Sequence, residues 1–308
     1  MARRALHGVL LLDKPLGLSS NDALQKAKWL LRAEKAGHTG TLDPLATGLL
    51  PLCFGAATKF SQVSLDADKR YIATVRLGVR TTTGDREGAV TLQRPVQLER
   101  AAIDAACARF TGPISQVPPM HSAIKKDGRA LYEYARAGIE VERLPRPIRI
   151  HSIAVLHWQL DELVIEVACS KGTYIRTLAE DIGAHLGCGA HLTALQRIGS
   201  GSLQLSGAVT LEVLTAMTED QREAWLLPPD VLLVSWPRVE LDACEAGRFL
   251  TGLRRRISQP DAAAVRVYGP APHALLGTAH ICAGELIADR LLSPIEVQAQ
   301  RPAVMAAT

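Results

Sequence analysis

The stretch His38–Gly48, with the sequence HTGTLDPLATG, places the strongest local constraint on how this chain can fold. It has neither the alternation of a strand nor the period of a helix, and two glycines and a proline interrupt it. Pro44 fixes its own φ angle and pushes Asp43 toward an extended backbone. We therefore expect a stiff loop that presents one carboxylate. Because Asp-Pro is also a common turn opener, these residues alone leave a purely structural role for Asp43 open.

Three further motifs accompany this loop along the chain. They are LDKP at residues 12–15 with the following Gly17 and Ser19-Ser20, DKRY at 68–71, and SKGTYIRT at 170–177. In this order and at these spacings, the four motifs resemble those of the bacterial TruB-type pseudouridine synthases. Four motifs in order are far more specific than any one of them. The resemblance covers roughly residues 8–200 and fades beyond them.

The resemblance implies an α+β fold with two domains. A catalytic domain is expected at residues 1–230, built on a mixed, mainly antiparallel sheet flanked by helices. An inserted lobe is expected at about 113–149, where prolines and basic residues suggest an extension from the core. A small β-rich PUA-like RNA-binding domain is expected at 233–308, an assignment made by its position and by the number of short strands.

Hydrophobic patterning predicts the individual elements. Helices are expected from Ser19, Ser20 or Asp22 to near Gly37, at 98–110, 131–136 and from about 175, with a helix pair at 211–225. Strands are expected at 8–12, 71–77, 150–159, 163–169, 239–241, 263–267, 275–281 and 285–292, and a buried segment at 49–54. The strands at 150–159 and 163–169 are close enough to form a hairpin.

The resemblance also implies an activity, the isomerisation of the uridine at position 55 in the T-loop of tRNAs to pseudouridine. Asp43 would be the nucleophile and would attack either C6 of the uracil or C1′ of the ribose. Arg176 would keep that carboxylate ionised, and Tyr71 would stack on the target base and help to remove the C5 proton. Arg176 lies near the start of a predicted helix, where the helix dipole disfavours a cation unless an anion is close. Asp43 is the candidate for that anion.

The remaining expected site residues would bind the substrate. Tyr174 and Leu195 match positions that line the uridine pocket, and His38 matches the residue that fills the gap when the base swings out. Lys14 lies at the end of a predicted strand, where it could contact an RNA phosphate or pair with the neighbours of Asp13, and the resemblance implies that this segment packs near the catalytic loop. Each of these side chains could instead have a purely structural role. Flipping a stacked base costs a few kcal/mol, so contacts to the surrounding RNA must offset that cost.

Composition excludes several other classes of protein. The six cysteines are scattered among 308 residues without a C-x-x-C pair, so neither a disulfide framework nor a metal site is expected. No dinucleotide fingerprint or P-loop is present, and the isomerisation requires no cofactor. The N-terminal residues carry no signal-peptide core and no apolar run is long enough to cross a membrane, so we expect a cytoplasmic protein that does not bind membranes.

The expected partner is tRNA, bound through its T-arm stem-loop by a monomer. The net charge of +4 is mild, but arginines cluster at 143–149 and 254–256, where they could neutralise phosphates. Tyr132 and Tyr134, beside basic residues in the insert, could stack on bases or simply pack the insert. The same groups leave an alternative open, a tRNA-binding folding chaperone that acts without chemistry.

Overall fold

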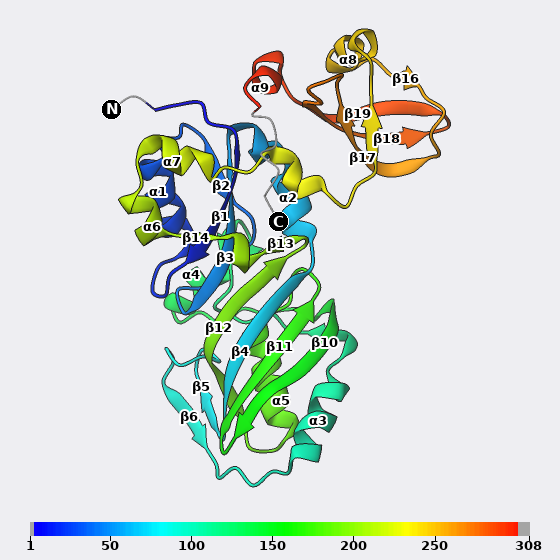
Figure 1. Cartoon of the computed structure of the whole chain (residues 1–308). Helices are drawn as coiled ribbons and strands as arrows, with labels where there is room; N and C mark the ends of the chain where they lie inside the picture. The colour runs from blue at the N-terminus through cyan, green and yellow to red at the C-terminus, as the bar shows by residue number, and fades with distance from the viewer. Residues whose placement is uncertain (1–2, 301–308) are drawn as a thin grey trace. The chain divides into compact units, whose positions relative to one another are not determined.

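The structure, a computed structural model, describes residues 3–300 of the chain. Its contacts divide the chain into two compact units. The first comprises Met1–Pro44, Gly48–Leu65 and Ser202–Thr308, and the second comprises Leu45–Thr47 and Asp66–Gly201. Figure 1 shows the chain, with labels on many of its helices and strands. The chain passes from one unit to the other within the loop that carries Asp43, and again after Leu65 and after Gly201.

The first unit is built on a small mixed sheet. Strand β1 (Gly8–Lys14) runs antiparallel to β3 (Ala46–Phe54) and parallel to β14 (Val209–Thr210), while β2 (Ala36–His38) pairs antiparallel with β3. Most of β1 and β3 is buried, as expected of strands that are apolar on both faces. The predicted strand at 8–12 and buried segment at 49–54 are thereby confirmed.

Helix α1 (Ser20–Leu30) begins as predicted but ends earlier than predicted. The Ser19 side chain caps its start by accepting a hydrogen bond from the Asp22 amide. The helix ends at Leu30 because Arg32 adopts a positive φ of 53° and residues 36–38 pair with β3 instead. The predicted loop is shorter for a similar reason, since its first and last residues belong to β2 and β3.

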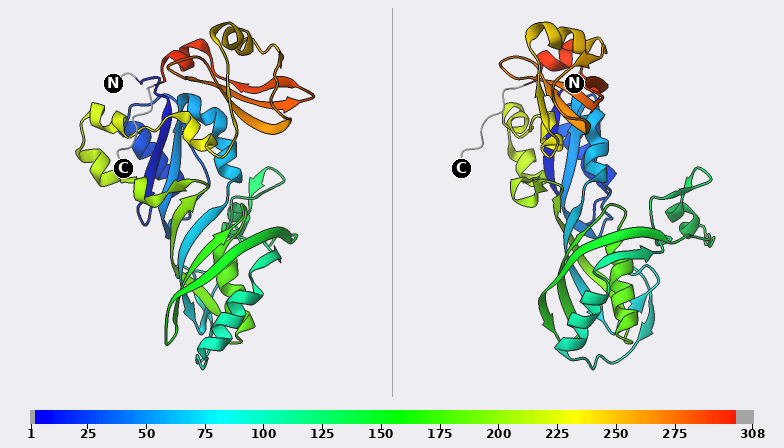
Figure 2. Two further views of the ribbon diagram at one scale, coloured as in Figure 1. Left: turned by 45° about the vertical axis from the view of Figure 1, so that its right-hand side comes forward. Right: turned by 90° about the vertical axis from the view of Figure 1, so that its right-hand side faces the viewer.

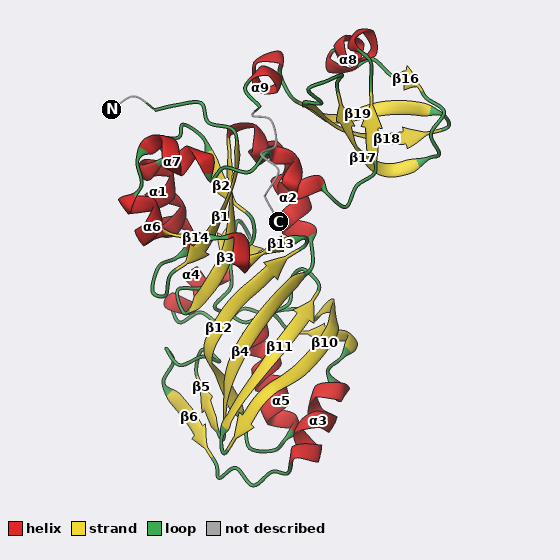
Figure 3. Ribbon diagram, viewed as in Figure 1, coloured by secondary structure: helices red, strands yellow, loops and turns green. Residues whose placement is uncertain are grey.

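An antiparallel sheet forms the second unit, and two helices cover one of its faces (Figure 3). The strands lie in the order β12-β4-β11-β10-β7, and α3 (Arg100–Arg109) and α5 (Ile175–His185) pack against them. The strand bounds are Ala190–Ser200 for β12, Lys69–Leu77 for β4, Glu162–Cys169 for β11, Arg146–Gln159 for β10 and Gly112–Gln116 for β7. The β10–β11 hairpin and both helices confirm the predictions for these segments.

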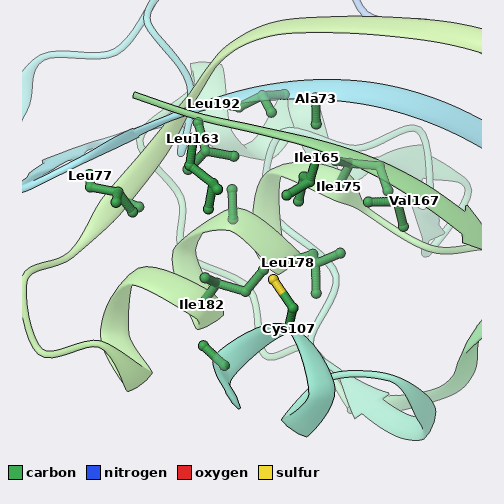
Figure 4. Close-up of a cluster of buried hydrophobic side chains, with 14 of the residues drawn as sticks. Ala73, Leu77, Cys107, Leu163, Ile165, Val167, Ile175, Leu178, Ile182 and Leu192 are labelled. Atoms are coloured by element: carbon green, nitrogen blue, oxygen red, sulfur yellow. The ribbon is translucent and has the colours of Figure 1, made fainter. Parts of the chain in front are cut away.

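Alternate residues of β4 and β11 build the core beneath α5 (Figure 4). Ala73 and Leu77 of β4 and Ile165 of β11 are buried against Leu178 and Ile182 of α5. Burying one such aliphatic side chain contributes about 1.5–3 kcal/mol, so this contact fixes the helix firmly on the sheet. The start of α5, which carries Arg176, is therefore held at one end of the sheet.

Both ends of the expected insert belong to the sheet, because β7 pairs with residues 146–150 of β10. Residues 117–145 leave the sheet and contain the short hairpin β8 (Lys125–Lys126) and β9 (Arg129–Ala130), followed by α4 (Leu131–Arg136). The predicted helix at 131–136 is confirmed. Figure 2 shows the insert extending away from the sheet of this unit.

The C-terminal part of the first unit is rich in strands, as predicted. After the helix pair α6 (Leu211–Ala216) and α7 (Glu219–Ala224), five strands form a sheet in the order β15-β17-β18-β19-β16. Their bounds are Arg238–Glu240, Ala262–Tyr268, Leu275–Cys282, Glu285–Leu291 and Arg255–Arg256 respectively. Helix α8 (Ala243–Leu250), capped by Asp242, was not predicted. The domain boundary near 230 and the PUA-like RNA-binding assignment stay predictions.

Candidate active site

The loop that carries Asp43 is fixed on both sides of that residue within the first unit. The hydroxyl of buried Ser20 accepts a hydrogen bond from the Leu42 amide at 2.7 Å and donates one to the Leu42 carbonyl at 2.9 Å. The Gly17 amide donates to the Pro44 carbonyl at 2.8 Å. Asp43 itself is half-buried. The segment that contains Gly17 and Ser20 thus holds the backbone on either side of a partly exposed carboxylate.

Lys14 ends β1 and is fully buried, with 0% of its surface exposed. Its ammonium group donates to the carbonyls of Pro15 at 2.9 Å and Leu18 at 2.6 Å. These bonds close the turn that leads to Ser19 and the start of α1. Burial also raises the pKa of the neighbouring Asp13 carboxyl above its usual value. The substrate contact expected of Lys14 stays a prediction, and these bonds give the side chain a role in holding the turn.

His38 ends β2, opposite Leu52 of β3, and is half-buried. The next residue, Thr39, is fully buried and accepts a hydrogen bond from the Ser64 hydroxyl at 2.9 Å. The Thr39 amide also donates to the Pro51 carbonyl at 3.0 Å, so the backbone on this side of the loop is anchored as well. These contacts do not test the predicted role of His38 beside a flipped base, which stays a prediction.

Tyr71 and Leu195 lie on neighbouring strands of the second unit. Tyr71 of β4 pairs with Val167 of β11 and Arg197 of β12, while Leu195 pairs with Ala73. Both side chains are half-buried and pack against the edge of the core. Opposed residues of an antiparallel pair share a face, so Tyr71 and Leu195 lie on the side of the sheet that α5 covers.

Arg176, at the second position of α5, is 6% exposed and bonded on several sides. Its guanidinium donates to the His121 carbonyl at 2.6 Å and to the Thr83 carbonyl at 3.3 Å. It also pairs with the Asp85 carboxylate at 3.6 Å, and both side chains are 6% exposed. A buried cation near the start of a helix requires such partners, because both desolvation and the helix dipole disfavour it.

Asp85 is the functional candidate that the sequence reasoning missed. The Thr83 hydroxyl donates to its carboxylate at 2.6 Å, and the Glu87 amide donates to the same oxygen at 3.1 Å. Glu180, one turn after Arg176, is a second nearby carboxyl, and burial raises its pKa above the usual value. The Thr-Gly-Asp sequence at 83–85 signals a side-chain-bonded turn, but nothing in it indicates a partner 91 positions away.

Tyr174 precedes α5 and is half-buried. Two hydrogen bonds with a single side chain fix its backbone. The Tyr174 amide donates to the Gln116 side chain at 2.8 Å, and the Gln116 side chain donates to the Tyr174 carbonyl at 3.1 Å. Gln116 ends β7 at the base of the insert. Tyr174 is therefore held by the end of β7 and Arg176 by residues of two loops, all within one unit.

The expected site residues fall into two groups. Asp43, His38 and Lys14 belong to the first unit, whereas Tyr71, Tyr174, Arg176 and Leu195 belong to the second. The pairing of Asp43 with Arg176 would join the units and stays a prediction. What the second unit does establish is that Arg176 has an anionic partner, Asp85, as its position near a helix start requires.

The described residues offer neither a candidate metal centre nor a candidate membrane-spanning helix. Within residues 3–300, no three His, Cys, Asp or Glu side chains gather closely enough to hold a metal ion. In the same range, no helix combines the length and the apolarity needed to cross a bilayer.

Two family profiles match adjacent parts of the chain. The profile described as TruB family pseudouridylate synthase (N terminal domain) matches residues 28–175, and that of the tRNA pseudouridylate synthase B C-terminal domain matches 176–234. A protein named tRNA pseudouridine synthase B from Verminephrobacter eiseniae is 62% identical over 96% of this chain and 91% of its own length. The protein of that name from Cupriavidus pinatubonensis is 61% identical over 95% of this chain and 96% of its own.

Solved structures show the same fold at low sequence identity. A chain of a Cbf5-Nop10-Gar1 complex matches 95% of this chain and 87% of its own length, with a TM-score of 0.74 and 23% identity. A chain of an H/ACA RNP bound to a substrate RNA containing 2'-deoxyuridine matches 94% of this chain and 86% of its own, with a TM-score of 0.72 and 22% identity. On the strength of the family profiles and the close relatives, the chain belongs to the TruB family of pseudouridylate synthases.

Proposed function

We propose that this protein isomerises a uridine of tRNA to pseudouridine, with Asp43 as the nucleophile. The observation that carries the proposal is the anchored Asp43 loop, in which Ser20 and Gly17 hold the residues on either side of the carboxylate. Relatives with about 60% sequence identity over nearly the whole length of this chain are named tRNA pseudouridine synthase B. Those names favour an enzyme over a chaperone that acts without chemistry.

The reaction breaks the bond between N1 of uracil and C1′ of the ribose and forms a bond between C5 and C1′. The C5 hydrogen leaves as a proton, N1 gains a proton in its place, and nothing is oxidised or reduced. An ionised Asp43 would attack either C6 of the base or C1′ of the ribose to start this exchange. Tyr71 would stack on the detached base and help to take the C5 proton, while Tyr174 and Leu195 would line the pocket.

Arg176 would face Asp43 and favour its charged form. This role is supported by the buried position of Arg176 and by the three bonds that fix its guanidinium group. Asp85 would then share the arginine with Asp43. A guanidinium has five donors, enough to hold two carboxylates and two carbonyls in place.

The substrate is the T-arm stem-loop, and the modified nucleotide is the uridine at position 55. The target base must leave its stack before a nucleophile can reach it, and contacts to the RNA backbone would offset the cost. Exposed Lys125, Lys126 and Arg129 of the insert are suited to that task. We further propose that His38 fills the place of the flipped base, and that the protein acts as a monomer in the cytoplasm.

The test uses an unmodified tRNA transcript with tritium at uracil C5. Wild-type protein is expected to release the tritium, and Asp43→Asn is expected to lower the rate by at least a thousandfold, because an amide is a very poor nucleophile. Asp220→Asn, at an exposed position of α7, is the matched control and should keep the wild-type rate. Equal release by wild type and Asp43→Asn would refute the assignment of the nucleophile.

A further inference from the structure

Gln116 clamps the backbone at the start of α5 from both sides. Its side-chain oxygen accepts a hydrogen bond from the Tyr174 amide at 2.8 Å, and its side-chain nitrogen donates to the Tyr174 carbonyl at 3.1 Å. Gln116 is 2% exposed and is 58 residues from Tyr174 in the sequence. A buried side-chain amide that bonds to both the backbone N–H and the backbone C=O of one residue fixes the direction of the chain at that residue.

The clamp holds the start of α5 at an N-cap residue whose own side chain does not cap the helix. Tyr174 occupies the N-cap position, where a serine or aspartate side chain would usually bond to the first turn, and its own side chain makes no such bond. Arg176 follows two residues later. A change in the backbone direction at Tyr174 would therefore displace both the Tyr174 side chain and the guanidinium group of Arg176.

The segment that follows Gln116 touches the same helix start a second time. The Arg176 guanidinium donates to the His121 carbonyl at 2.6 Å, five residues beyond Gln116. The segment between them contains Pro118-Pro119, which restricts its backbone. The next residue, Ser122, bonds through its carbonyl to the Tyr132 amide at the start of α4. One short segment thus joins the insert to both Tyr174 and Arg176.

We propose that Gln116 is a positioning residue for the isomerisation, acting through the backbone of Tyr174 to place Tyr174 and Arg176 in the pocket. The proposal rests on the proposed function, since it assigns these two residues to the reaction. Gln116 does not touch the substrate. Its loss is expected to slow the chemical step while RNA binding by the insert is kept.

The experiment compares Gln116→Leu with Ile114→Val. Leucine cannot make either bond to Tyr174, whereas Ile114→Val only trims a half-buried side chain of the same strand. Both variants are assayed well below their melting temperatures with tritiated tRNA in single-turnover reactions. Gln116→Leu should lower the rate at saturating RNA about tenfold or more and change the Kd for RNA less than threefold. Ile114→Val should stay within twofold of wild type in both. Gln116→Met replaces Gln116→Leu if the latter fails to fold.

Amide hydrogen exchange at Tyr174 gives a readout that does not depend on activity. Exchange should quicken at least tenfold in Gln116→Leu and remain unchanged in Ile114→Val. An unchanged single-turnover rate in Gln116→Leu, an equal loss in both variants, or unchanged exchange at Tyr174 would each overturn the proposal. A wild-type protein that releases no tritium would refute the proposed function instead, and the exchange rates would still decide whether the clamp exists.

Discussion

Ser20 and Leu42, 22 residues apart in the sequence, exchange two hydrogen bonds through a single hydroxyl group. The Ser20 oxygen accepts from the Leu42 amide at 2.7 Å, and its proton goes to the Leu42 carbonyl at 2.9 Å. Both residues are buried, so no water can replace these bonds. The start of α1 thereby fixes the backbone one residue before Asp43.

Ser20→Ala should lower the rate of pseudouridine formation and destabilise the protein. The substitution leaves the buried amide and carbonyl of Leu42 unpaired, which costs about 1–3 kcal/mol. The freed loop should present Asp43 less well, and we expect about a tenfold loss in the single-turnover rate. Tritium release and chemical denaturation measure the two effects.

Ser19→Ala is the control for this variant, because Ser19 caps the same helix without touching Leu42. Loss of the cap should cost about 1 kcal/mol of stability and leave the rate within twofold of wild type. If both variants lose stability but keep their rates, the anchored loop has no part in presenting Asp43.

Asp85→Asn should damage both stability and catalysis. Arg176 would keep its charge in a buried site while losing the Asp85 carboxylate, and breaking a buried pair in this way costs about 3–5 kcal/mol. The guanidinium would also be less firmly oriented, so the single-turnover rate should fall at least tenfold at a temperature where the variant is folded. Denaturation curves and tritium release provide the measurements.

Asp104→Asn is the matched control for Asp85→Asn. It breaks the pair between Arg100 and Asp104 on α3, where both side chains are more than half exposed, at 56% and 52%. Such exposed pairs contribute about 0–1 kcal/mol, so neither stability nor rate should change much. Equal effects of the two substitutions would mean that burial of the Arg176–Asp85 pair has no special importance.

The burial of Lys69 leads us to expect an unusual dependence of stability on pH. Burial, with a smaller contribution from the Arg197 charge, lowers the pKa of Lys69 from 10.5 to about 8 in the folded protein. Between these values the unfolded chain binds more protons than the folded protein, so the contribution of Lys69 to the free energy of unfolding rises with pH. Below pH 8 the cost of the buried charge is fully present.

Lys69→Met removes this group and tests the prediction. The free energy of unfolding of wild type, relative to Lys69→Met, should increase by about 1 kcal/mol from pH 7.5 to pH 9. Urea denaturation of both proteins at several pH values gives the difference. A difference that is flat or falls over this range would show that Lys69 stays protonated in the folded protein.

The hairpin of the insert should contribute to RNA affinity and not to the chemical step. Lys125 and Lys126 are both exposed on β8. If each neutralises one phosphate, replacing both with alanine should weaken binding of a T-arm stem-loop and reduce the salt dependence of log Kd by about 1–2. The single-turnover rate at saturating RNA should remain unchanged.

The control for the hairpin replaces Arg100 and Arg109, two exposed cations of α3, with alanine. This change removes the same charge from the same unit outside the insert. Titrations at several salt concentrations compare the two double variants. An equal loss of affinity in both would assign the effect to net charge rather than to the insert.

Most of the secondary structure was predictable because local patterns determine it. The spacing of Ile175, Leu178 and Ile182 predicts α5, and the alternation after Tyr71 predicts β4. Helix α4 lies where its sequence predicts it. The predicted end of α1 was wrong because residues 36–38 pair with β3, and no local pattern in the sequence reveals a pairing with a distant strand.

The sequence by itself also determined the family, since four ordered motifs identify the loop of Asp43 and the helix that carries Arg176. Only the tertiary structure decided which residues hold these two in place. Asp85 and Gln116 lie 91 and 58 residues from the groups they contact, and Ser20 lies 22 residues from Leu42. Such contacts depend on which distant segments the fold brings together, whereas sequence periodicity indicates only which face of each helix or strand is buried.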